Sequence, residues 1–149
     1  MNYFINSSTV ALLKDGKKTI IYDVEKSVVI NKNIRSIIEF NCNYYGHSVN
    51  GTKKAIKKLL NIKYRVPIVV SISNNYTLIP VGNIRNDMCL FLVTSKIIDY
   101  EKCNDYLEIN CVNNNKFKVN FSINSFEKLL INSIRINNLL ISRKYNNYV

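Results

Sequence analysis

The side chains best suited to chemistry in this chain of 149 residues are lysines, not acids, nucleophiles or metal ligands. Between Glu39 and Asp87 the sequence contains no aspartate or glutamate. Positive charge without acidic neighbours over such a length needs a solvent-exposed face, an anionic partner, or both. The basic side chains in this interval are Lys53, Lys54, Lys57, Lys58, Lys63, Arg65 and Arg85.

The first four of these lysines follow a loop with two glycines, Gly46 and Gly51, and their spacing predicts a helix from about Thr52 to Leu60. Thr52 or Asn50 is expected to cap its start, and Asn61 to end it. The loop is not a phosphate-binding P-loop, because Gly51 is followed by Thr-Lys instead of Lys-Ser or Lys-Thr. Helical periodicity places Ala55, Ile56, Leu59 and Leu60 on one arc and Lys53, Lys54, Lys57 and Lys58 on the opposite arc.

A solvated lysine face is the common explanation of such a helix, but the missing acids favour a polyanion as partner. The net charge of +11 and the pI near 9.6 point the same way, to nucleic acid before membrane. The chain is also rich in Asn, Ile, Lys and Tyr, the residues of A/T-rich codons, so genome composition accounts for part of the charge. Genome composition does not account for its clustering.

The sequence offers no constellation of catalytic or metal-binding residues. His47 is the only histidine, and the four cysteines have no C-x-x-C spacing, so we expect reduced thiols and no metal. Asp99, Glu101 and Asp105 allow a weak hypothesis of a nucleic-acid enzyme, although a solvated loop explains them better. We therefore expect no catalytic residue, no cofactor and no small-molecule substrate. The cysteines are Cys42, Cys89, Cys103 and Cys111.

The chain has an ordinary globular composition, with 47% hydrophobic and 21% charged residues, and is expected to form one domain over residues 1–149. No apolar run is long enough to span a membrane, and the N-terminus does not resemble a signal peptide, so the expected location is the cytoplasm. Short β-branched runs broken by Asn and Gly predict an α+β fold of antiparallel hairpins with the basic helix in the middle. The predicted strands are Ser8–Leu13, Lys18–Val24, Lys26–Ile30, Val66–Ile72, Tyr76–Pro80, Met88–Thr94, Tyr106–Val112 and a partner strand with Phe117, Val119 and Phe121.

Two further helices are predicted, one from Ile34 up to Gly46 and a long C-terminal one from about Ser125 to Ser142. Asn124 and Glu127 fit a capping box at the start of the second. The apolar side chains of that helix exceed what one docking face needs, which favours an oligomer interface, although a helix wedged between two layers gives the same pattern. The stripe consists of Phe126, Leu129, Leu130, Ile134 and Ile141, and the candidate interface residues outside it are Ile131, Ile136 and Leu139.

Several segments together carry a resemblance to a known family. They are Cys42–Gly51 with its basic continuation, Val66–Val69, Ile79-Pro80, Cys89–Leu92, Phe121-Ser122 and Ser125–Glu127. In order and spacing the chain resembles the competence transcription factor family, ComK, from about Ser8 to Leu140. The resemblance implies a DNA-binding activator of competence and DNA-uptake genes. Such a protein acts as an oligomer, a dimer or a pair of dimers, at paired A/T-rich boxes, largely through the minor groove, in the cytoplasm at the nucleoid.

The chain departs from the family pattern G-S-S-Y-x-G-R, because His47, Val49 and Thr52 replace the first serine, the tyrosine and the arginine. It also ends soon after the final helix, without the C-terminal extension that some members use in regulated proteolysis. These departures leave promoter specificity and control by proteolysis open. They also leave an alternative function, a diverged paralogue that modulates a relative by forming heterodimers. The residues expected to contact DNA are Ser48, Asn50, Lys53, Lys54, Lys57, Lys58, Lys63 and Arg65.

Overall fold

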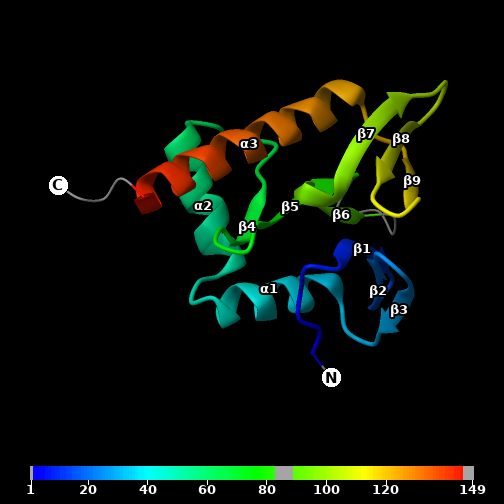
Figure 1. Cartoon of the computed structure of the whole chain (residues 1–149), viewed down its shortest axis with the longest axis horizontal. Coiled ribbons are helices and arrows are strands. Elements are labelled where there is room, and N and C mark those ends of the chain that lie inside the picture. The colour runs from blue at the N-terminus through cyan, green and yellow to red at the C-terminus, as the bar shows by residue number, and fades with distance from the viewer. Residues whose placement is uncertain (1, 83–88, 146–149) are drawn as a thin grey trace.

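A computed structural model describes residues 2–82 and 89–145 of the chain. It has the expected α+β fold, with antiparallel sheets and three α-helices, the last of them long (Figure 1). The helices are α1 (Ile34–Tyr44), α2 (Val49–Leu60) and α3 (Ile123–Tyr145), with a short 3-10 turn, η1 (Thr94–Lys96). The strands are β1 (Thr9–Asp15), β2 (Lys18–Asp23), β3 (Ser27–Ile30), β4 (Ile68–Ser71), β5 (Tyr76–Val81), β6 (Leu90–Val93), β7 (Ile97–Lys102), β8 (Leu107–Cys111) and β9 (Lys116–Val119).

Six strands form one sheet in the order β3-β2-β1-β6-β5-β4, and three form a second sheet in the order β7-β8-β9. Every neighbouring pair is antiparallel. The pairing of β1 with β6, with Leu12 opposite Phe91, joins the N-terminal hairpins to the β4–β5 hairpin. The two halves of the chain therefore share one hydrogen-bonded sheet.

The six-stranded sheet is covered on both faces (Figure 1). Helix α1 packs on one face, where Ile37 and Ile38 meet Leu12 and Leu78. The three-stranded sheet and the first half of α3 pack on the other. Because both faces are buried, β4 and β6 do not alternate between apolar and polar residues: apart from Ser71 they are apolar, and all four residues of each are buried. A third cluster lies where α2 and the second half of α3 meet the sheet beside β4; its buried residues are Ile56, Leu60, Val66, Val69 and Ile136.

Most of the predicted elements are confirmed. The β1–β2 hairpin turns at Gly16, whose φ of 60° lies in the left-handed region that suits glycine. The predicted β8–β9 hairpin is present, and Leu107, Ile109 and Cys111 lie on its buried face as expected. Residues 83–88 of the loop and strand expected between Val81 and Thr94 lie outside the described part of the chain.

The prediction of a solvated acidic loop fails for Asp99 and Glu101, which lie in a strand, and is confirmed for Asp105, which is exposed in the loop before β8. Asp99 and Glu101 belong to β7, which pairs with β8. Acidic residues disfavour strands in isolation, but cross-strand pairing decides here, since Asn110 Nδ2 donates to Asp99 Oδ1 over 2.6 Å. Among the described residues, no three His, Cys, Asp or Glu side chains gather where they could hold a metal ion.

The start of α3 also differs from the prediction. The helix begins at Ile123, and Ser122 caps it, because its Oγ accepts the Ser125 N–H over 3.1 Å. The capping box of Asn124 with Glu127 is therefore wrong. Glu127 instead accepts a hydrogen bond from the Tyr100 hydroxyl at 2.7 Å, which ties α3 to β7 and raises the pKa of Tyr100.

The apolar stripe of α3 is divided differently from the prediction. Ile136 is fully buried in the third cluster and Leu139 is half-buried beside it, whereas Ile131, Ile134 and Ile141 are 55%, 58% and 42% exposed. The reason is that α3 packs on two layers in turn, first on the sheets and then on α2. Its buried face therefore shifts around the helix axis. Ile136 is a core residue of the monomer, which contradicts its expected exposure.

This division predicts that truncating two isoleucines on one helix lowers the free energy of unfolding by very different amounts. We expect Ile136→Ala to lower the free energy of unfolding by about 2–5 kcal/mol, since it leaves a cavity in a packed cluster. Ile131→Ala, the matched control, should change it by less than about 0.5 kcal/mol, because the side chain is largely in water. Urea unfolding followed by circular dichroism measures both. Equal losses for the two variants would show that the buried face of α3 is wrongly placed.

Candidate nucleic-acid interface

The basic helix α2 begins at Val49, three residues before the predicted start. Ser48 is its N-cap, in the extended conformation, and its Oγ accepts the Gly51 N–H over 2.9 Å. The expected caps Thr52 and Asn50 are wrong, because both lie inside the helix. A side chain at Gly51 would place its Cβ only 2.8 Å from Ser48 Oγ, so glycine suits this cap. Asn61 ends the helix with a φ of 54°, as predicted.

An acid lies at the start of α2 but not beside its lysines. Glu39 Oε2, from α1, accepts the Val49 N–H over 2.9 Å. The free N–H groups at a helix N-terminus carry partial positive charge, so this contact satisfies that end of α2. Glu39, the last acid before the acid-free interval, therefore contacts the backbone of α2 and does not neutralise its lysines.

The four lysines of α2 form two rows. At 100° per residue, Lys53 and Lys57 lie on one flank of the helix, and Lys54 and Lys58 lie on its outer surface. Lys53 is half-buried and the other three are exposed. The buried side of the helix holds Val49, Ile56 and Leu60. The predicted apolar arc is therefore wrong for Ala55 and Leu59, which are exposed on the opposite flank.

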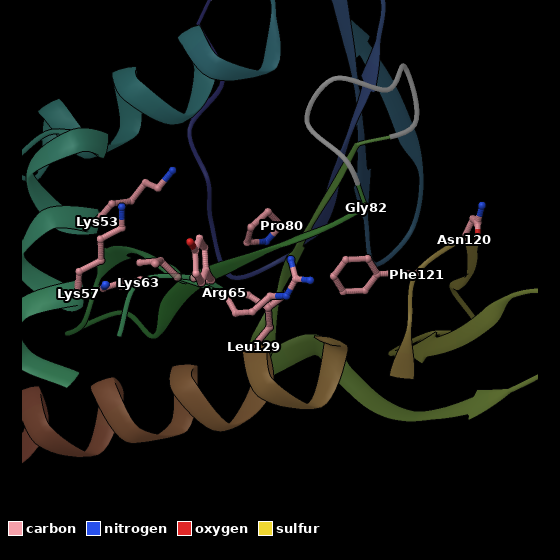
Figure 2. A pocket seen from close by; sticks show the side chains of 11 residues that line it. Lys53, Lys57, Lys63, Arg65, Pro80, Gly82, Asn120, Phe121 and Leu129 are labelled. Carbon is pink, nitrogen blue, oxygen red and sulfur yellow. The ribbon is translucent and has the colours of Figure 1, made fainter. Parts of the chain in front are cut away.

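The flank with Lys53 and Lys57 borders an open groove of about 710 Å³ (Figure 2). Lys63, Tyr64 and Arg65 follow α2 and line the same groove, so basic side chains far apart on the helix and the loop face one space. Tyr64 is 78% exposed there. The remaining lining residues come from the loop before β4, from β5 and its end, from the segment after β9 and from α3; they are Val66, Pro80, Gly82, Asn120, Phe121 and Leu129.

Arg65 is held in a fixed position in the groove. Its φ of 58° is in the left-handed region, and Asn132 Nδ2 of α3 donates to its carbonyl over 3.0 Å. Its guanidinium donates to Ser125 Oγ over 2.8 Å and lies 5.4 Å from the centre of the Phe121 ring. Arg65 therefore joins the loop after α2 to the start of α3.

The groove is strongly positive. Burial lowers the pKa of Lys53 from its usual value, and the nearby charges of Lys57 and Arg35 lower it further. Within residues 2–82 and 89–145, the ion pair present is that of Lys116 with Glu108, 3.9 Å apart on the three-stranded sheet. No acidic side chain of the described residues thus lies within ion-pair distance of Lys53, Lys57 or Lys63. Such a surface attracts a polyanion.

Sequence reasoning missed three residues of this surface, namely Arg35, Tyr64 and Phe121. Arg35 Nη2 donates to Asn50 Oδ1 at 3.4 Å, which links α1 to the flank of α2. Arg35 precedes the acid-free interval, and nothing in its spacing relates it to the lysines. Tyr64 and Phe121 adjoin the groove only because the chain folds back, so no local pattern marks them.

The three departures from the family pattern all point away from the lysine rows. His47 is half-buried, and its Nε2 lies 2.8 Å from the Val70 carbonyl oxygen. Thr52 Oγ1 donates to the Val69 carbonyl at 3.4 Å, and Val49 belongs to the core cluster under α1. All three side chains therefore lie where α2 and the residues before it pack on β4 and α1.

Comparison with known proteins identifies the family of the chain. A model of the ComK protein family matches residues 1–144. The chain belongs to the ComK family. It is 26% identical over 132 residues to the competence transcription factor of Bacillus subtilis (strain 168), a match that covers 85% of this chain and 68% of that protein. No solved structure matches the chain. The family expected from the segments quoted above is confirmed.

Proposed function

We propose that this chain is a transcription regulator of the competence type that binds double-stranded DNA through the basic groove and α2. The observation that carries the proposal is the convergence of Lys53, Lys57, Lys63 and Arg65 on one groove, with no acid among the described residues to neutralise them. Membership of the ComK family and the name of the Bacillus subtilis relative support it. Its activity is binding rather than catalysis, and its place is the cytoplasm at the nucleoid.

The geometry divides the basic side chains by task. The two lysines of each row on α2 are four residues apart, about 6 Å along the helix axis, which suits contacts to successive phosphates of one backbone. Lys63 and the exposed Tyr64 stand on the loop beside it and are free to reach toward a groove of the DNA. Arg65 is hydrogen-bonded to Ser125, so it adds positive charge to the site but is not free to extend toward the DNA.

Minor-groove binding constrains which element enters the DNA. The minor groove is about 6 Å wide, too narrow for a helix, whereas the major groove, at about 12 Å, admits one. We therefore propose that α2 lies along the backbone while the loop after it places Lys63 at the minor groove. A/T-rich DNA has a narrow minor groove with strong negative potential, which favours cations there. The expected preference for A/T-rich sites follows from that arrangement.

A salt titration tests the phosphate contacts. If about four to six cations contact phosphates, log K for duplex DNA should fall against log salt with a slope of about −4 to −5. The double variant Lys53→Gln/Lys57→Gln should reduce the steepness of that slope by about 2 and weaken binding to all sequences alike. Fluorescence anisotropy with a labelled duplex measures both quantities.

The matched control for that experiment removes two charges elsewhere. Lys26→Gln/Lys102→Gln changes the net charge equally but acts in exposed positions on the β2–β3 turn and β7. An equal loss of slope in the control would mean that overall charge, and not the groove, binds DNA. A wild-type protein without measurable binding at 100 mM salt, chosen as a working condition of about physiological strength, would favour the heterodimerising modulator instead.

A competition experiment tests the choice of groove. Netropsin, which occupies the A/T minor groove, should displace the protein, whereas methyl groups confined to the major groove should leave its affinity within about twofold, because the donors and acceptors read there are not used. Binding that survives netropsin but fails on major-groove-modified DNA would reassign α2 as a recognition helix. G/C-rich duplex of equal length serves as the control for A/T preference.

A homo-oligomer through α3 also belongs to the proposal, with a corrected set of residues. Ile131, Ile134 and Ile141 are exposed in the monomer and follow one another at helical spacing. A two-fold contact there would place two basic grooves at a fixed separation, as paired boxes require. We expect Ile131→Glu/Ile134→Glu to yield a folded monomer by light scattering, and the wild type a dimer at tens of micromolar (an order-of-magnitude choice for a weak homodimer). A wild type that stays monomeric under these conditions would remove α3 from the interface.

A further inference from the structure

A second cavity lies beside the basic groove, between α1, the start of α2 and the six-stranded sheet. Its volume is about 350 Å³, within the usual range of ligand sites, about 300–1,000 Å³. Lys53, Val66 and Pro80 line both this cavity and the groove, so the two spaces adjoin. Most of the wall is apolar and belongs to buried core residues: Ile34, Ile38, Val49, Val66, Ile68, Cys89 and Phe91.

The charged side chains that line the cavity, among the described residues, are basic, and Asn33 adds a neutral polar one. Lys14, Arg35 and Lys53 come from β1, α1 and α2 respectively, and no lining residue among those described is acidic. Arg35 is exposed, and its contact with Asn50 is long, at 3.4 Å, so most of its guanidinium donors face outward. The lowered pKa of Lys53, which results from burial and from its cationic neighbours, is consistent with positive charge that no protein carboxylate neutralises.

The apolar wall and the basic side chains of the cavity favour a ligand that has both an apolar part and an anionic part. An apolar wall without polar partners excludes a dianion such as free phosphate from the interior, because its desolvation would not be offset. A neutral apolar molecule would give Arg35 and Lys53 no anionic partner at the cavity. A carboxylate on an apolar body satisfies both, since a guanidinium and an ammonium bind a carboxylate through charge-assisted hydrogen bonds.

We propose that this cavity binds a small carboxylate with an apolar body, of the kind found in medium-chain fatty acids. Its apolar chain lies against Ile38 and Phe91, and its carboxylate lies between Arg35 and Lys53. The site shares Lys53 with the basic groove but does not need DNA, so it is expected to fill in the absence of DNA. Its effect on DNA, a weakened affinity through neutralisation of Lys53, is the one part that rests on the proposed function.

Isothermal calorimetry without DNA tests the site, with octanoate as the probe. For a ligand of this size, a dissociation constant on the order of 0.1 mM is expected, well below micelle-forming concentrations. Octanol, which keeps the chain and loses the charge, and inorganic phosphate, which keeps a charge and loses the chain, should each bind at least tenfold more weakly. Octanol binding as tightly as octanoate would overturn the assignment of a carboxylate.

Two charge variants locate the carboxylate. Arg35→Gln should weaken octanoate binding by roughly tenfold or more, as loss of a charged hydrogen-bond partner predicts. The matched control, Lys102→Gln, removes an exposed charge from β7 and should leave binding within about twofold. Because Arg35 is exposed, the variant is expected to fold, and circular dichroism verifies that. Equal weakening by both variants would show attraction to net charge without a site.

Isoleucine methyl spectra locate the apolar chain. Ile34, Ile38 and Ile68 line the cavity, whereas Ile109 belongs to β8, in the cluster on the opposite face of the six-stranded sheet, and Ile131 lies on the exposed face of α3. Octanoate should shift the first three methyl signals and leave the last two unchanged. No shift at millimolar octanoate, about tenfold above the expected dissociation constant, overturns the proposal. Shifts at all five also overturn it, because they mean unspecific adsorption. DNA binding that fails while these shifts persist would sink the proposed function alone.

Discussion

The basic groove depends on the contacts between Arg65 and α3. The chain must reverse between α2 and β4, and it does so with a non-glycine residue at a φ of 58°, a conformation that costs free energy unless its surroundings hold it. Asn132 supplies one such contact through the Arg65 carbonyl, and Ser125 supplies another through the guanidinium. These contacts fix the loop against a helix that begins about sixty residues later in the chain. The position of Lys63 and Tyr64 beside α2 follows from that attachment.

The second half of α3 holds the other side of the groove in place. Ile136 packs with Ile56 and Leu60 of α2, and Arg135 Nη2 reaches the Leu60 carbonyl at 3.4 Å, where the free carbonyls of a helix end carry partial negative charge. Repulsion among the lysines of α2 opposes folding of the helix on its own, and the packing on α3 offsets it. An anionic partner would relieve the same repulsion, so binding and local stability favour the same state.

The sequence allowed the class of the fold and the location of the basic surface to be predicted, because both depend on local patterns. Turns at Gly16 and Asn61 and the alternation of Leu107, Ile109 and Cys111 are local signals, and each is confirmed. The errors occur where the structure of a segment depends on packing against an element that is distant in the sequence. The acids of β7 form a strand because β8 pairs with them, and the apolar stripe of α3 is misassigned because that helix crosses two layers. Arg35 was missed for the same reason, since only the packing of α1 brings it to α2.

The adjoining cavities give the chain a physical basis for coupling two ligands. Lys53 borders both the groove and the cavity, so an anion bound in either one interacts with its charge. A carboxylate beside it removes about one phosphate contact, which lowers DNA affinity by an amount that shrinks as salt rises. Thermodynamic linkage requires the converse, so DNA must weaken carboxylate binding by the same factor. This coupling needs no change of shape, because it acts through one side chain. Its sign follows from charge alone. Lys53→Gln, which replaces the charged ammonium group with a neutral amide, would abolish the coupling, while both ligands would still bind, each more weakly.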